Sequence, residues 1–332
     1  MNRRERIAAA LVGKETDRLP FSLWRHFPNL DHHPRKLAEL SLEYQRKYDL
    51  DFIKFTPYGM LATIDWGVKL KFFPGFDQAT VAAEPAIRSE DDWLNLEPYT
   101  GTDGEYLHAL EALRILMLEV PKDVPVVQTA FSPLTNAMKM AGEEALLSYM
   151  REAPEKLEKG LEVIAETTAG YLKESVRRGA EGVFFSTQMS CYSKLTVEEH
   201  QRFVKKYDLR ILEALGKDAW FNILHLHGAD VMFKESLDYP VTAFNWHDQD
   251  DGPSFEEARR LTNKCLVGGL SHLKVLLEKN AEEKIARAIK DAWGCGKMPG
   301  VILGPGCVVD PGTPEHYLCH IRDCVYATGA KH

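Results

Sequence analysis

The sequence predicts an α/β protein built as a (β/α)8 TIM barrel. Short apolar segments rich in β-branched and aromatic residues recur along the chain, and amphipathic helical stretches separate them. We count eight such segments, at residues 19–24, 51–55, 124–130, 180–186, 220–226, 241–246, 264–270 and 300–304. Strands that alternate with helices form right-handed βαβ units around a parallel sheet. Eight units fit a closed barrel better than an open sheet, because no G-x-G-x-x-G sequence follows the first strand.

The segments between the expected strands carry the periodicity of amphipathic helices. They cover residues 34–48, 144–179, 196–216, 255–262 and 281–293. The segment 57–123 is longer than one helix needs and contains the aromatic, glycine and proline-rich stretch 66–76. It predicts an insertion after strand two, in the form of a small hairpin over the barrel mouth. We therefore expect one barrel domain over residues 1–332.

Composition and charge narrow the class of protein. The 332 residues carry a net charge of -8, with 45% hydrophobic and 27% charged residues, which is typical of a globular protein. No basic stripe is present, which disfavours a nucleic-acid partner, and no apolar run is long enough for a membrane span. The first residues predict a helix instead of a signal peptide. The six unevenly placed cysteines do not form the disulfide framework of a small secreted protein, so we expect reduced thiols and a cytoplasmic location.

Polar residues gather where the expected strands end, which is where the active site of such a barrel lies. The candidates for catalysis are His247, Asp248 and Arg25, and the candidates for cofactor binding are Gln188, Tyr192 and His272. Each has a plainer interpretation. The acidic run after Asp248 could be a solvated loop, Arg25 could make a surface ion pair, and His272 could simply begin a helix.

The sequence LHLHG suggests a metal site at the end of the fifth strand. Residues two apart in a strand point the same way, so His225 and His227 can present two imidazoles to one point. Cys307, in a Gly-Pro-Gly-Cys turn after the eighth strand, would add a thiolate. Two imidazoles and a thiolate suit a catalytic zinc ion with one open position. The alternative is that His227 is a hydrogen-bonded histidine and Cys307 a small buried hydrophobe.

Together these landmarks resemble the uroporphyrinogen decarboxylase superfamily over nearly the whole chain. The segments RERIAAALVGKETDRLPFSLW, VPVVQTAFSPLTNAMKM, GAEGVFFSTQ, ILHLHG, FNW, GGL and GPGCVVDPGTPEHYL follow the order and spacing of that family. The resemblance implies a (β/α)8 barrel, often a homodimer. It also implies one of two chemistries: metal-free decarboxylation of a tetrapyrrole, or zinc-dependent methyl transfer that commonly joins a corrinoid protein and a thiol.

The residues of the decarboxylase branch are largely missing. Decarboxylases of the superfamily have two arginines in a W-x-M-R-Q-A-G-R segment, and only Arg25 matches the first of them. Their aspartate after strand two, tyrosine after strand three and last-strand histidine fall at Thr56 or Pro57, near Lys139, and at Pro305. The resemblance thus implies that the decarboxylase site is essentially absent.

The methyltransferase branch is matched in two of three zinc ligands. These enzymes carry H-x-C-G at the end of strand five and G-P-G-C after strand eight. His225 and Cys307 match, whereas His227 stands where the first cysteine is expected. Imidazole in place of thiolate makes the metal a stronger Lewis acid, and it leaves the acceptor open between a thiol and the heteroatom of a methyl ether or methylamine.

We therefore expect a zinc-dependent methyltransferase that acts on a small-molecule substrate or thiol, with a corrinoid partner protein. Two alternatives remain open. One is a divergent decarboxylase acting on a smaller carboxylate, with Arg25 and Lys139 as anion binders. The other is a non-catalytic protein that binds a tetrapyrrole or corrinoid.

Overall fold

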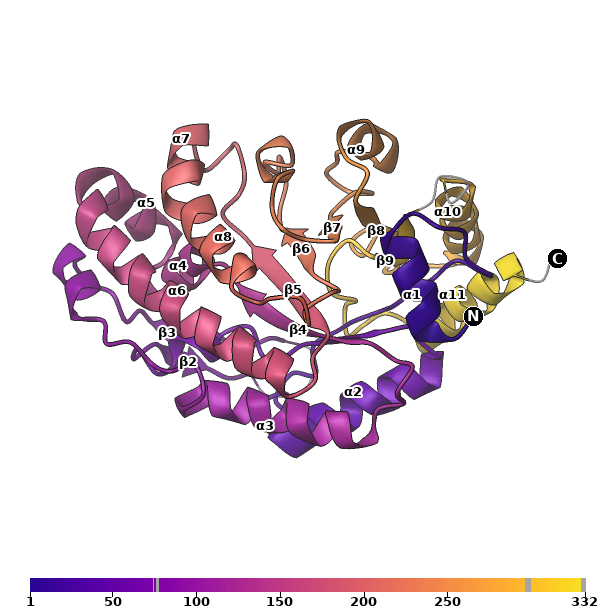
Figure 1. Cartoon of the computed structure of the whole chain (residues 1–332), viewed down its shortest axis with the longest axis horizontal. Helices are drawn as coiled ribbons and strands as arrows, with labels where there is room; N and C mark the ends of the chain where they lie inside the picture. Colours follow the sequence, from indigo (N-terminus) through magenta and orange to yellow (C-terminus); the bar gives the residue numbers. More distant parts are fainter. Residues whose placement is uncertain (74, 76–77, 296–299, 330–332) are drawn as a thin grey trace.

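Seven parallel strands form a curled sheet at the centre of the molecule (Figure 1). The structure is a computed structural model that describes residues 1–73, 75, 78–295 and 300–329. The strands stand in the order β1 (Ile53–Phe55), β4 (Val126–Phe131), β5 (Gly182–Thr187), β6 (Ile223–Leu226), β7 (Ala243–Trp246), β8 (Cys265–Leu270) and β9 (Val301–Pro305). Seven of the eight expected apolar segments therefore contain strands, each within a few residues of its predicted bounds.

The first expected strand, at residues 19–24, is wrong as a regular strand. Phe21 makes only an isolated parallel bridge to Leu303 of β9, where the Ser22 amide donates to the Leu303 carbonyl at 3.0 Å. On its other side, Phe21 accepts a hydrogen bond from the amide of Asp51 at 2.9 Å, just before β1. Pro20 has no N–H to donate, which limits the ladder here. The segment nevertheless connects the two edges of the sheet.

Helices cover the outside of the sheet (Figure 1). They are α1 (Arg3–Leu11), α2 (Pro34–Tyr48), α3 (Gly104–Glu119), α4 (Pro133–Ala141), α5 (Glu143–Glu152), α6 (Pro154–Arg177), α7 (Val197–His200), α8 (Lys206–Glu213), α9 (Phe255–Leu261), α10 (Glu282–Cys295) and α11 (Glu315–Gly329). The π-helical turn η3 (Gln201–Lys205) joins α7 to α8. The short 3-10 helices are η1 (Leu61–Thr63), η2 (Glu90–Asn95) and η4 (Lys234–Ser236).

Two connections differ from a simple alternation of strands and helices. The stretch 144–179, expected as one helical segment, is divided at Ala153 because Pro154 disfavours the helical conformation of the residue before it. Between β6 and β7 the connection contains only η4.

The chain between β1 and α3 contains η1, η2 and a two-stranded antiparallel sheet of β2 (Lys69–Lys71) and β3 (Val81–Glu84). These strands flank the region where a hairpin was expected. Positions 74 and 76 of the predicted stretch 66–76 lie outside the described residues. That this region is an insertion covering the barrel mouth stays a prediction.

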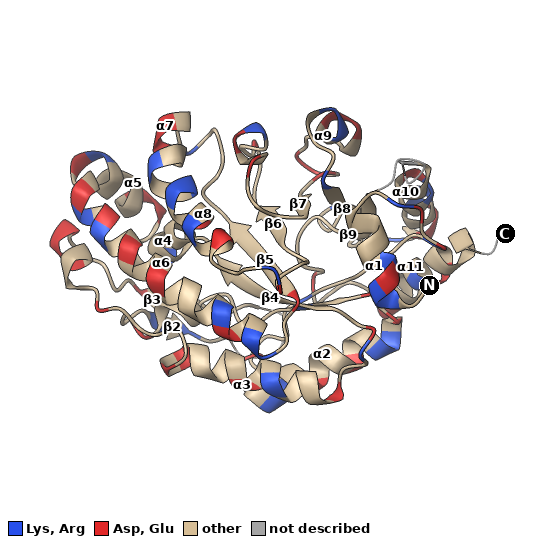
Figure 2. Cartoon of the chain, viewed as in Figure 1, with Lys and Arg blue, Asp and Glu red and all other residues tan. Residues whose placement is uncertain are grey.

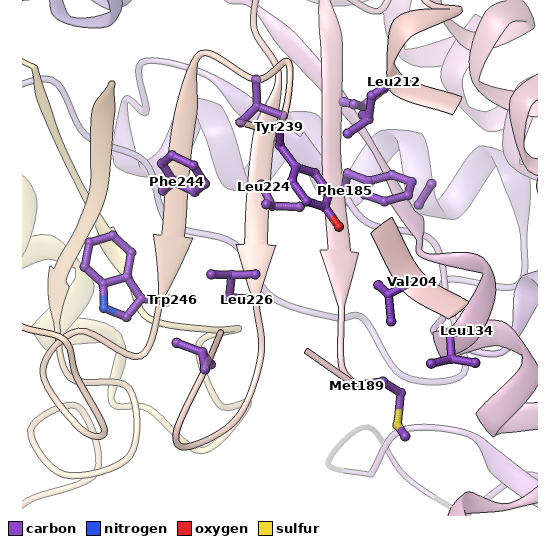
Figure 3. Packing of buried hydrophobic residues seen from close by; sticks show 14 of the residues in the cluster. Leu134, Phe185, Met189, Val204, Leu212, Leu224, Leu226, Tyr239, Phe244 and Trp246 are labelled. Atoms are coloured by element: carbon purple, nitrogen blue, oxygen red, sulfur yellow. The ribbon is translucent and has the colours of Figure 1, made fainter. Parts of the chain in front are cut away.

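Alternation along the strands divides the core into two layers. Ile223 of β6 and Ala243 of β7 belong to a cluster inside the curled sheet, together with Trp24, Phe52 and Phe184. Their neighbours in sequence point the other way. Leu224, Leu226, Phe244 and Trp246 pack outward with Leu134, Val204 and Leu212 from the surrounding helices (Figure 3). The period of two that packs the outer layer therefore turns the remaining strand residues inward.

Charged side chains of both signs are interspersed over the outer helices, while the strands are almost free of them (Figure 2). In the part of the chain that the structure describes, no helix is both long enough and apolar enough to cross a membrane.

Candidate metal centre

Three histidines and a cysteine meet at the carboxyl edge of the sheet. His225 lies in β6, His227 follows its end, His247 follows β7, and Cys307 follows β9. One donor atom from each residue lies within 4.8 Å of those of the other three. Each residue brings a nitrogen or sulfur ligand, so the cluster has the donor set that zinc prefers. The sequence named His225, His227 and Cys307 for this role, and the structure adds His247.

His225 is held in one orientation by Asn245, its partner in the register of β6 with β7. The two side chains are joined by a 2.6 Å hydrogen bond between His225 Nδ1 and Asn245 Oδ1. The Asn245 amide nitrogen donates to the carbonyls of Val267 at 2.8 Å and Pro305 at 3.1 Å. Because both amide hydrogens are engaged, the oxygen must face His225, and His225 Nδ1 must carry the proton. Nε2 of His225 is left with a free lone pair.

His247 is oriented in the same way by a carboxylate. Its Nδ1 lies 3.0 Å from Oδ2 of Asp251, one helical turn further along the loop. Its Nε2 is buried and has no hydrogen-bond partner among the described residues. A buried nitrogen with no partner is costly in a folded protein, and a metal ion or a ligand atom at the cluster would satisfy it.

Cys307 completes the cluster from the far side of the sheet. Its sulfur lies 3.7 Å from Nδ1 of His227. The turn that carries it passes close to the end of β7, since a Cβ at Gly306 would lie 3.1 Å from the Cα of His247 and 3.2 Å from the Trp246 carbonyl oxygen. Only a glycine fits comfortably at such a contact. The Gly-Pro-Gly-Cys turn therefore brings the thiol alongside the histidines.

The electrostatics of the cluster favour neutral ligands before metal binds. Burial, followed by the neighbouring histidines, lowers the pKa of His225 well below its ordinary value and the pKa of His227 to about 4. Burial raises the pKa of the Cys307 thiol. At neutral pH both imidazoles are ready to bind a cation, whereas the thiol must release a proton to do so.

The predicted catalytic residue Asp248 faces away from the four donors. Its carboxylate accepts hydrogen bonds from the Gly269 amide, at 3.0 and 3.2 Å, and from the Gln249 side chain at 2.7 Å. Burial raises its pKa to about 7. Its contacts tie the loop after β7 to β8, and they are the contacts of a positioning group.

The other predicted residues lie around the cluster at different depths. His272 is close, with its ring centroid 4.8 Å from that of His247, and burial lowers its pKa to about 4. Gln188 is half-buried after β5, where its amide donates to Thr135 at 2.9 Å. Tyr192 is 41% exposed, and its hydroxyl lies 3.3 Å from Glu235.

Arg25 is half-buried and forms no ion pair with any described residue, contrary to the plainer expectation of a surface ion pair. Its Nε donates to the His26 carbonyl at 3.2 Å, and its guanidinium lies 5.8 Å from the Phe27 ring centroid.

Sequence reasoning missed Lys54, which projects inward from β1. Its Nζ donates to Thr56 at 3.0 Å and lies 4.5 Å from the ring centroid of Phe184. Lys54 interacts electrostatically with Cys307 and His225. The signal was present in DFIKF, where a lysine stands between two apolar residues of a strand. Asn245 and Asp251 were missed as partners of the histidines because only the register and the loop conformation bring them there.

A curled parallel sheet with metal-binding side chains gathered at its carboxyl edge is the architecture of barrel-type α/β enzymes. The sequence match is more specific. Residues 2–327 match the family described as uroporphyrinogen decarboxylase (URO-D), and the chain belongs to this family, whose members include methyltransferases and decarboxylases.

Named relatives fall on both sides of that division. The methylcobamide:CoM methyltransferase MtbA of Methanosarcina acetivorans is 22% identical over 239 residues, which cover 72% of this chain and 68% of that one. The uroporphyrinogen decarboxylase of Syntrophotalea carbinolica is 28% identical over 255 residues, which cover 73% and 71%.

Solved structures support the fold. A methyltransferase from Methanosarcina mazei superposes with a TM-score of 0.82 at 18% identity, covering 98% of this chain and 99% of that one. A B12-independent methionine synthase from Shewanella sp. W3-18-1 gives a TM-score of 0.59 at 12% identity, covering 94% and 97%.

Proposed function

We propose that this protein is a zinc-dependent methyltransferase that moves a methyl group between a small substrate or thiol and a corrinoid carried by a partner protein. The observation that carries the proposal is the cluster of four donors within 4.8 Å. Relatives named methylcobamide:CoM methyltransferase support the choice of reaction. We further propose that the chain works in the cytoplasm as a single domain and as a homodimer.

The residues present fit a zinc ion. The lone pair of His225 Nε2 and the unpartnered Nε2 of His247 both call for a cation, and the free thiol of Cys307 can supply a thiolate. We assign His225, His227 and Cys307 as the ligands. A bound zinc would act as a Lewis acid that activates the heteroatom gaining or losing the methyl group.

His247 has a second role in this proposal. A catalytic zinc site keeps one position open for substrate, so four permanent protein ligands would close it. His247 differs from His225 and His227 because a carboxylate, Asp251, lies at its Nδ1. That carboxylate would stabilise the imidazolium, so Nε2 of His247 can accept the proton of an incoming thiol or alcohol. Gln188, Tyr192 and His272 remain our candidates for contacts to the corrinoid.

Metal analysis of the purified protein tests the proposal. We expect one zinc per chain, and loss of both zinc and thermal stability in Cys307→Ala and His225→Ala. Cys324→Ala, which changes a half-buried cysteine on α11, should keep its zinc. Metal-free protein of normal stability would contradict the metal centre.

Turnover separates the methyltransferase from the two alternatives. With methylcobalamin as donor, we expect demethylation that depends on an added thiol or phenol and is lost in Cys307→Ala. Conversion of uroporphyrinogen would favour the decarboxylase. Retention of cobalamin without turnover would favour a binding protein.

A further inference from the structure

A small cavity lies beside the candidate metal centre, between the end of β1, the segment around Arg25, and α2. Its volume is about 20 Å³, which is room for a head group of about the size of a water molecule. Lys54, Thr56, Arg25 and Tyr44 are among the residues that line it.

The cavity contains positive charge without a counterion. Lys54 and Arg25 are its charged lining residues, and none of the lining residues is acidic. Neither cation forms an ion pair with any described residue. The contrast with the rest of the protein is strong, because the chain has a net charge of -8 and most of its other lysines and arginines have carboxylate partners. Two cations facing one cavity repel each other unless an anion lies between them.

Lys54 is the more revealing of the two. It is fully enclosed, donates to Thr56 at 3.0 Å, and has the face of Phe184 beside its ammonium group. This single neutral hydrogen bond leaves two of its three donors for another acceptor. Burial lowers the pKa of Lys54 to about 7. A carboxylate beside the amine would favour its charged form and offset that burial.

Tyr44 adds a donor from α2. Its hydroxyl is buried and has no hydrogen-bond partner among the described residues, although Arg25 is close enough to influence it electrostatically. The side-chain oxygen of Gln45 at the same cavity also has no partner, and it can accept a hydrogen bond from Arg25 or from a water. A phenol O–H, an ammonium and a guanidinium together form the donor set of an oxyanion site.

We propose that Lys54, Tyr44 and Arg25 form a subsite for the carboxylate of an anionic substrate, next to the metal centre. A carboxylate is favoured over a phosphate or sulfonate because it is planar and the cavity is small. That the bound carboxylate belongs to the methyl-transfer substrate rests on the proposed function. The electrostatic coupling of Lys54 to Cys307 and His225 sets this subsite beside the donors that would hold the metal.

Titration calorimetry of the full-length protein as purified, with sodium acetate as the probe, tests the subsite. Ionic strength is matched with sodium chloride, and acetamide serves as the neutral analogue of the same shape. We expect acetate to bind and acetamide not to bind. Lys54→Met and Tyr44→Phe should each weaken acetate binding about tenfold, because each removes one hydrogen bond to a charged acceptor. Arg25→Gln should weaken it at least as much.

Controls separate the subsite from a general loss of structure. Lys279→Met changes an exposed lysine, and Tyr149→Phe changes a tyrosine outside the cavity. Both should bind acetate like the unaltered protein. The thermal melting of each variant without acetate shows whether it is folded, and Tyr44→Phe removes only the hydroxyl oxygen, so it keeps the test meaningful if Lys54→Met fails to fold.

Three results would overturn the proposal. The first is an absence of acetate binding in the unaltered protein, which would leave the cavity to water. The second is weakening in Arg25→Gln alone, with Lys54→Met and Tyr44→Phe unchanged. The third is tighter binding of inorganic phosphate or methanesulfonate than of acetate. Zinc content, measured on the same samples, reports on the metal centre separately, so the two proposals can fail independently.

Discussion

The oxygen of the Asn245 side chain accepts a 2.6 Å hydrogen bond from Nδ1 of His225, and the nitrogen of the same amide is fixed by two backbone carbonyls. One asparagine thus connects β6, β7, β8 and the end of β9 beneath the donor cluster. It selects the tautomer in which His225 offers Nε2 to a metal. Such partners are part of a metal site even though they never touch the ion.

Asn245→Ala should therefore lower zinc affinity about 10- to 100-fold without removing a ligand, because His225 loses both its tautomer and its orientation. Competition with a chromophoric chelator measures the change. Asn263→Ala, which alters an exposed asparagine far from the cluster in sequence, is the control and should leave the affinity unchanged. Equal affinities in all three proteins would remove Asn245 from the site.

Zinc affinity should rise with pH near neutrality. The pKa of His227 is lowered to about 4 and that of His225 falls well below its ordinary value, so neither imidazole has a proton to lose between about pH 7 and 8. The pKa of the Cys307 thiol is raised, so the thiol is protonated in the metal-free protein and releases one proton on binding. The dissociation constant should fall about tenfold per pH unit over that range.

Cys307→Ser should flatten this dependence while weakening binding at every pH, because the hydroxyl stays protonated. Chelator competition at several pH values gives the slope for both proteins. An unchanged slope in Cys307→Ser would show that another group releases the proton.

His227→Cys tests the substituted ligand. The resemblance places a cysteine at this position, and the His227 nitrogen already lies 3.7 Å from the Cys307 sulfur. We expect the variant to bind one metal ion with two thiolates. In the cobalt-substituted protein, the sulfur-to-cobalt charge-transfer absorption should roughly double relative to the unaltered protein. Cys324→Ser should leave the spectrum unchanged, and a spectrum of His227→Cys identical to that of the unaltered protein would place residue 227 outside the metal's coordination.

Much of the fold could be predicted because each parallel strand is a short apolar run bounded by polar residues. The segment at Pro20 and Phe21 could not be distinguished from a strand, since its apolar pattern does not reveal how many ladder hydrogen bonds it makes. Likewise, the position of Pro154 marks a helix break only when the residue before it is examined for its restricted conformation.

The candidate site was predictable where chemistry lies in the local sequence, as it does for His225, His227 and Cys307. His247 was recognised as a polar strand-end residue but assigned to catalysis, because its distance from the other donors depends on how β7 stands in the sheet. Lys54 was overlooked because one lysine in an apolar strand carries no motif, and only the inward direction of its side chain brings it near Cys307. Long-range register, which the sequence does not display, decides these cases.

Asp208 gives a prediction on stability that is independent of the metal. It is a fully buried carboxyl on α8 that accepts a 3.0 Å hydrogen bond from Tyr239, and burial raises its pKa from 3.8 to about 7. The folded protein therefore keeps this proton at pH values where the unfolded chain has released it. Stability from this group is present below about pH 4 and is lost as pH rises towards about 7, by up to about 4 kcal/mol.

Asp208→Asn should remove that loss, since an amide has the same shape, can still accept from Tyr239 and does not ionise. Denaturant unfolding at pH 5 and pH 8 measures the difference in free energy of unfolding between variant and unaltered protein. We expect the difference to shift in favour of Asp208→Asn at the higher pH, while Asp218→Asn, on an exposed turn, shows no such shift. A difference that stays constant between the two pH values would mean that Asp208 is ionised in the folded protein, and that its hydrogen bond with Tyr239 is strong enough to offset the burial of the charge.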